Sequence, residues 1–126
     1  QSPRRDVILL KNTNRSKKRI NIHLSKEDIN AILCALPLIS YLDTGSDMQN
    51  EINEALMVTA SEKLSSKNPN LVPNEYRIIY TAVALAVNVD VFLMDTEIDP
   101  QWRSDLKRYF FSLNRIHELT KDQIYK

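Results

Sequence analysis

Two stretches of this chain carry the same order of apolar and helix-starting residues. The first opens at Leu24 and the second at Leu71, which is 47 positions later. In each stretch a helix-start sequence is followed by an apolar row with helical spacing and then by a second amphipathic helix. The first rows are Ile29, Ile32, Leu33, Leu36 in one stretch and Tyr76, Ile79, Tyr80, Val83 in the other. The pattern predicts two helical hairpins, at about 25–66 and 74–118.

Three explanations of this repeat are compatible with the sequence. An internal duplication would give two hairpins that close on each other as a four-helix bundle. A fragment of an α-solenoid would explain why a third start resembles the others at Leu119. Unrelated amphipathic hairpins would also align this well by chance. All three predict a mainly α fold, and we expect the four-helix bundle.

The first hairpin has clear helix-start signals. Ser25 and Asp28 form a short capping box, and the first helix should run to about Leu42 with a kink at Pro37, which lacks a backbone donor. A turn at 43–45 precedes the second helix, which Ser46 should cap. The apolar positions expected to face inward on this helix are Met48, Ile52, Ala55, Leu56 and Thr59.

The second hairpin begins with the most apolar segment of the chain. A helix from about 74 to 94 should lie at the centre of the domain. The fourth helix should start at Asp99 and Pro100, which suit the cap and first-turn positions. Its expected inward row lies 54 positions after that of the second helix and consists of Trp102, Leu106, Tyr109, Phe110 and Leu113.

Composition excludes several classes of protein. The chain has 126 residues, enough for one domain with its own core, and only one cysteine, Cys34, so it cannot form an internal disulfide. A reducing, cytoplasmic location is therefore expected. The single glycine, Gly45, rules out the glycine-rich loops that bind nucleotide phosphates. Polar residues at 88 and 90 make a membrane span costly. We expect no membrane contact, cofactor or small-molecule substrate.

No residue pattern indicates catalysis or metal binding. The acidic segment 95–99 resembles a calcium loop, but Pro100 and Leu106 stand where an EF-hand needs glycine and glutamate. His23 and His117 lack cysteine or carboxylate neighbours at ligand spacing. Cys34 belongs to an apolar helical row and should be a small buried side chain. We expect a protein that is not an enzyme and binds no metal.

The first 24 residues differ from the rest of the chain in charge. Seven basic side chains and one acidic one give residues 1–20 a net charge of +6, whereas the remainder carries −5. Two β-prone runs flank a turn-forming cluster at 12–16, so a short β-hairpin within 1–24 is expected. The candidate contacts to phosphates or to an acidic partner are Arg4, Arg5, Lys11, Arg15, Lys17, Lys18 and Arg19.

Three aromatic side chains are candidates for a protein interface. Phe111 falls outside the expected inward row of its helix, and we group it with Tyr41 and Tyr125 as exposed anchors. We expect a non-enzymatic protein-interaction or regulatory module whose binding surface combines the basic arm with the apolar face that the first helix leaves uncovered. Self-association is expected because that helix is apolar on two sides and the two strands of the arm can pair with another edge. The alternative function is a nucleic-acid-binding regulator that uses the arm as a phosphate clamp.

Overall fold

The computed structural model describes residues 23–66, 70–88 and 98–124. Within these ranges the chain is mainly helical and contains no β-strand, as the sequence predicts. The elements are α1 (Lys26–Ala35), the 3-10 helix η1 (Leu36–Tyr41), α2 (Asp47–Leu64), α3 (Pro73–Val87), α5 (Pro100–Arg108) and α6 (Phe110–Ile124). The predicted β-hairpin and the seven basic residues of the arm lie outside the described residues, as does Tyr125.

The start of α1 and its change into η1 follow the sequence signals. The hydroxyl of Ser25 accepts a hydrogen bond from the backbone amide of Asp28 at 3.1 Å, and the Asp28 carboxylate accepts a hydrogen bond from the backbone amide of Ser25 at 2.9 Å. This is a complete capping box. Pro37 is the second residue of η1, where the α-helix gives way to the tighter 3-10 form. The predicted kink is therefore a change of helix type.

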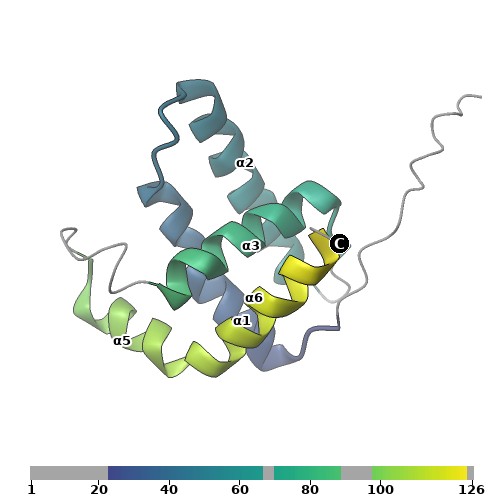
Figure 1. Ribbon diagram of the computed structural model, residues 1–126, viewed down its shortest axis with the longest axis vertical. Helices are drawn as coiled ribbons and strands as arrows, with labels where there is room; N and C mark the ends of the chain where they lie inside the picture. The colour runs from purple at the N-terminus through teal and green to yellow at the C-terminus, as the bar shows by residue number, and fades with distance from the viewer. Residues whose placement is uncertain (1–22, 67–69, 89–97, 125–126) are drawn as a thin grey trace, which may run out of the picture.

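Helix α3 is the central element, as predicted. It contacts α1, η1, α2 and α6 (Figure 1). Small and β-branched side chains allow this close packing, and Ile79, Ala82 and Val83 are almost completely buried. They join a core to which α1, η1 and α6 contribute Ile32, Leu36 and Leu113. Burial from several sides explains why α3 has the most continuous apolar sequence.

The C-terminal end of α3 was predicted wrongly. The helix ends at Val87 and not near residue 94. Asn88 leaves the helical conformation, with φ −115° and ψ 26°, and its side-chain amide donates to the carbonyl of Ala84 at 2.9 Å. An asparagine that satisfies a late helical carbonyl is a local stop signal. That signal outweighs the apolar residues that follow it.

The predicted fourth helix is two helices. Asp99 caps α5 as expected, accepting a bond from the Gln101 amide at 3.3 Å, but the chain leaves the helix at Tyr109 and resumes as α6. Most of the predicted inward row is kept across this break, since Trp102 and Tyr109 also pack against the core. Leu106 and Leu113 are buried as predicted, whereas Phe110 is 45% exposed.

The inward face predicted for α2 is wrong at every position except Leu56. Met48, Ile52, Ala55 and Thr59 are exposed, and only the C-terminal part of the helix is buried, at Ala60 and Leu64. Half-buried Leu56 and Met57 precede these two residues and pack against the core. The buried row is therefore rotated by about a third of a turn from the predicted one. The N-terminal part of α2 stands away from the other helices (Figure 1).

Two buried carboxylates connect the helices through ion pairs. Asp28 of α1 pairs with Arg115 of α6, and Glu75 of α3 pairs with Lys63 of α2, with Lys63 Nζ 2.9 Å from Glu75 Oε1. Both carboxylates are 3% exposed, and each also accepts a hydrogen bond from a backbone amide at the start of its helix. They are 47 positions apart, so they are corresponding residues of the two aligned stretches.

These carboxylates should make stability depend on pH. Burial by itself raises their pKa, but bonds from Arg115 and Ser25 to Asp28, and from Lys63 and Val72 to Glu75, outweigh it and lower both pKa values below the ordinary 3.8 and 4.5. The unfolded chain then takes up protons first as pH falls. The two carboxylates stabilise the fold fully when the pH is above their ordinary pKa values. This stabilisation is lost as the pH falls through their lower pKa values in the folded chain.

We expect Glu75→Gln to reduce this pH dependence. Urea unfolding between about pH 6 and 3 should show a smaller fall in the free energy of unfolding than in the wild type. The matched variant Lys63→Met keeps the carboxylate and removes its partner. The pH dependence of its free energy of unfolding should lie between that of the wild type and that of Glu75→Gln. Identical slopes for all three proteins would contradict the role given to Glu75.

Candidate functional site

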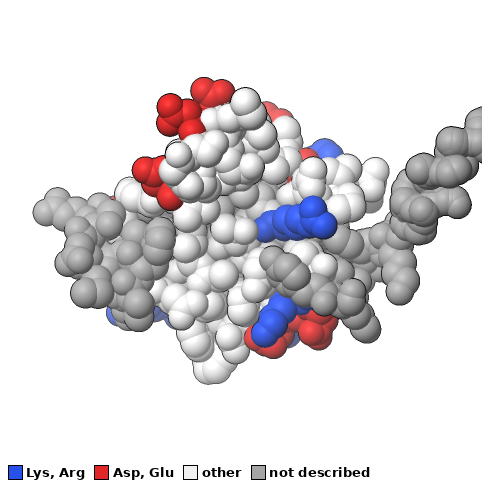
Figure 2. Space-filling view, turned by 45° about the horizontal axis from the view of Figure 1, so that its top comes forward, with Lys and Arg blue, Asp and Glu red and all other residues white. Residues whose placement is uncertain are grey.

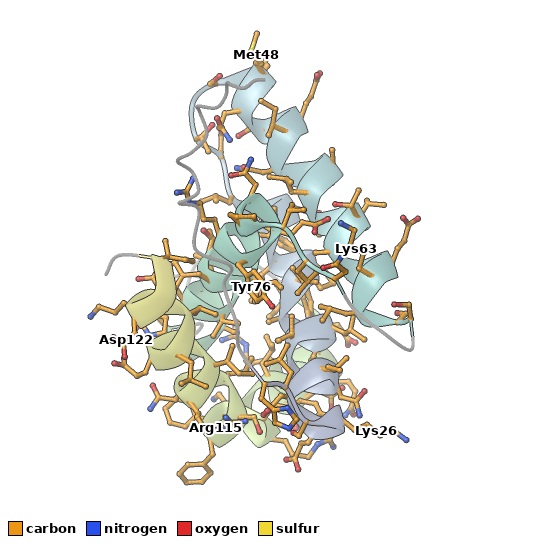
Figure 3. All side chains as sticks on the ribbon, turned by 90° about the vertical axis from the view of Figure 1, so that its right-hand side faces the viewer. Lys26, Met48, Lys63, Tyr76, Arg115 and Asp122 are labelled. Atoms are coloured by element: carbon orange, nitrogen blue, oxygen red, sulfur yellow. The ribbon has the colours of Figure 1, made fainter. Side chains whose placement is uncertain are left out.

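The projecting part of α2 exposes an apolar row. Met48, Ile52 and Val58 are 73%, 45% and 48% exposed. Met48, Ile52 and Ala55 follow one another at helical spacing, so they form one continuous stripe, and Val58 lies beside it. Met48 stands at the end of α2 that is farthest from the body of the molecule (Figure 3). Large apolar side chains grouped on one face commonly mark a binding surface.

Acidic residues flank this apolar row. Residues 43–62 contain five acidic side chains and no basic one, a net charge of −5. Glu51, Glu54 and Glu62 lie on the same side of the helix as Val58, next to the stripe. All three are exposed. Figure 2 shows acidic side chains gathered over the projecting end of the molecule. We call this surface, formed by Met48, Glu51, Ile52, Glu54, Ala55, Val58 and Glu62, the α2 face.

A groove borders the α2 face where α2 diverges from α3. It has a volume of about 350 Å³ and is lined by Gln49, Ile52, Asn53, Leu56, Asn74, Arg77, Ile78 and Thr81. Ile52 belongs to both surfaces, so the groove continues the apolar stripe toward α3. The polar lining residues offer amide and hydroxyl groups, and Arg77 donates to the side chain of Asn74 at 3.4 Å. Such a groove suits a side chain of a bound polypeptide.

The turn before α2 holds the projecting end in place. The Asp43 carboxylate accepts bonds from the Gly45 amide at 2.9 Å and from the Asn50 side chain at 3.2 Å, and these bonds lower its pKa. The side-chain oxygen of Asn50, Oδ1, in turn accepts hydrogen bonds from the backbone amide and the hydroxyl of Thr44. Gly45 has φ +84°, which other residues rarely adopt. The α2 face is therefore supported by an ordered turn.

Two of the three predicted aromatic anchors lie in the described residues, and both are exposed. Tyr41 is 41% exposed and lies against Trp102, with ring centroids 5.9 Å apart. Phe111 is 87% exposed and contacts only Phe110 among the described aromatic rings. Tyr41 is the last residue of η1, and Phe111 is the second residue of α6.

Cys34 and His117, which were considered as candidates for catalysis or metal binding, pack against neighbouring side chains. Cys34 is half-buried, and burial raises the pKa of its thiol. The indole of Trp102 donates to the Cys34 carbonyl at 2.7 Å, which joins α5 to α1. His117 stacks on Tyr80, with ring centroids 5.0 Å apart. Among the described residues, no group of three or more histidine, cysteine or acidic side chains could hold a metal ion.

Comparisons with known proteins add no assignment. No protein-family model matches the chain, no curated protein matches it, and no solved structure matches its fold. Within the described part of the chain, no helix has the length and apolar character needed to span a membrane.

Sequence reasoning missed the α2 face because it assigned the face to the core. The first row on α2, the predicted one, contains Met48, Ile52, Ala55, Leu56 and Thr59, and the second, which packs against the core, contains Leu56, Met57, Ala60 and Leu64. The run of acidic residues beside the first row was the available signal, because such residues disfavour burial of their neighbours.

Proposed function

We propose that this chain is a non-enzymatic protein-interaction module that self-associates through the α2 face. The observation that carries the proposal is the exposure of Met48, Ile52 and Val58 on a helix end that stands apart from the core. Covering these side chains removes apolar surface from water, at about 25 cal/mol for each Å². The ordered turn around Asn50 reduces the conformational entropy lost on binding. A mainly helical bundle of the kind predicted, from two hairpins, would serve as the rigid support.

Self-association can be measured by light scattering coupled to gel filtration. The concentration series should be run at about 0.5 M salt, which screens contacts between exposed charges. We expect a mass above that of the monomer at high concentration for the wild type. Ile52→Glu should shift the series toward monomer, because it places a charge in the middle of the apolar stripe.

Two further variants test the location of the interface. Leu119→Glu changes an exposed apolar residue of α6, 37% exposed, and should leave the mass unchanged. Phe111→Ser removes the predicted aromatic anchor at the α5–α6 corner. If Phe111→Ser abolishes association and Ile52→Glu does not, the interface lies at that corner. A monomer at every concentration would rule out self-association.

The alternative function, nucleic-acid binding by the arm, has its own support in the arm's net charge of +6. Filter binding at low and moderate salt tests it. Retention of nucleic acid that falls steeply with salt and is lost on neutralising Lys17, Lys18 and Arg19 would favour the alternative. Retention that does not depend on these residues would count against it.

A further inference from the structure

The α2 face and the N-terminal arm are complementary in charge and in apolar character. Residues 43–62 carry −5, and residues 1–20 carry +6. The arm also contains the apolar run Val7–Leu10, next to Arg4 and Arg5 and followed by the basic cluster Arg15–Arg19. The α2 face offers the matching combination, an apolar stripe beside a row of glutamates. We propose that the arm of the same molecule docks on the α2 face and covers it.

Reach allows this contact within one molecule. The arm joins the body at Ser25, and α1 and η1 together extend about 27 Å from there toward the start of α2. Helix α2 then runs back toward α1. In Figure 3 Lys26, Lys63 and Met48 lie in that order from bottom to top. The cluster Arg15–Arg19 lies six to ten residues before Ser25 and can span about 20 to 35 Å when extended.

Attachment to the same chain favours the arm over a second molecule. Two groups joined by a short stretch of one chain meet at an effective concentration in the millimolar range. A second molecule at micromolar concentration can therefore bind the α2 face only when the arm is displaced from it. The inference rests on the proposed function, because it assigns the arm as a cover of the self-association surface. Self-association should then increase with salt. Salt weakens the ionic contacts between the arm and α2 more than the apolar contacts between two molecules.

The acidic row on α2 is available to the arm. Glu51 and Glu54 form no ion pair within the described part of the chain, and both side chains are exposed. Other basic residues near α2 are already engaged: Lys63 pairs with Glu75, and Arg77 donates to Asn74. Glu118 and Asp122, two exposed carboxylates of α6, serve as the comparison.

Zero-length carbodiimide cross-linking of the full chain tests the contact directly. The reagent joins lysine amines to carboxylates that touch them, and mass spectrometry locates the joined peptides. At low salt, Lys11, Lys17 and Lys18 should join Glu51, Glu54 or Glu62 about tenfold more often than they join Glu118 or Asp122, reflecting the contact concentration. Cross-links spread evenly over both groups of carboxylates would overturn the proposal.

An equal mixture of normal and ¹⁵N-labelled protein separates contacts within one molecule from contacts between molecules. We expect the arm–α2 cross-links to contain one isotope only; cross-links that combine the two isotopes in half of the cases would overturn docking within one molecule. This readout does not depend on self-association. If Ile52→Glu has no effect on mass but these cross-links form, the proposed function fails and the inference holds.

The triple variant Lys17→Ala, Lys18→Ala, Arg19→Ala provides the second readout. If the arm covers the α2 face, the variant should self-associate at low salt as the wild type does at high salt. Lys121→Ala, which removes an exposed cation from α6, is the matched control and should behave as the wild type. Association of the triple variant that is as weak as that of the wild type at low salt would overturn the covering role.

Discussion

Replacing Ile79 with alanine should lower the free energy of unfolding by about 2 to 5 kcal/mol. Ile79 is 1% exposed and lies in the helix that contacts α1, η1, α2 and α6. Removing its side chain leaves a cavity that rigid neighbours on several sides cannot fill. Urea unfolding at low protein concentration, followed by circular dichroism, measures the loss.

The same substitution on α2 is the matched control. Ile52→Ala should change the free energy of unfolding by no more than about 0.5 kcal/mol, because the side chain is 45% exposed and alanine is a better helix former. If Ile52→Ala costs as much as Ile79→Ala, α2 packs through the row predicted from the sequence. The assignment of that row to the surface would then be wrong.

The second large effect is expected at the ion pair between α1 and α6. Arg115→Ala should cost about 1 to 3 kcal/mol, because the carboxylate of Asp28 stays buried at 3% exposure and loses its cation. Arg115 itself is 51% exposed, so water reaches the pair and the cost should fall short of that of a fully buried one. Thermal and urea unfolding near neutral pH measure this cost.

Arg108→Ala provides the comparison for that loss. Arg108 also pairs with a carboxylate, at 3.0 Å from Asp105, but the two side chains are 65% and 28% exposed. Surface pairs of this kind contribute less than about 0.5 to 1 kcal/mol. Equal losses for Arg115→Ala and Arg108→Ala would show that burial of Asp28 adds nothing to its pair.

The parts of the fold that could be predicted depend on local signals. Ser25 with Asp28, Ser46 and Asp99 begin helices because their oxygens accept backbone amides within the same turn. The central position of α3 follows from its apolar sequence. These features need only neighbouring residues, so the sequence alone contains them.

The parts that failed depend on contacts between distant residues. Whether α2 buries the row of Ile52 or the row of Ala60 is decided by how α3 crosses it, with Lys63 held against Glu75. The break at Tyr109 lies in a segment without glycine or proline, and Leu106 and Leu113 on its two sides join the same core. Spacing along a single helix cannot reveal such crossings.

The same limit explains the outcome for the candidate site. The exposure of Phe111 could be predicted because the residue lies outside the apolar row on either reading of its helix. The α2 face could not, because its stripe has the spacing of a core row. Its separation from the core follows from the turn at 43–46 and the angle at which α2 leaves the body (Figure 1).

The most direct test of the α2 face is a dilution series of amide spectra recorded on ¹⁵N-labelled full chain at about 0.5 M salt, where the charge contacts of the arm are screened. We predict that the amides of Met48 to Thr59 shift as the concentration rises from micromolar to millimolar, while those of α6 stay constant. Shifts confined to the α5–α6 corner, or spectra independent of concentration, would contradict self-association through the α2 face.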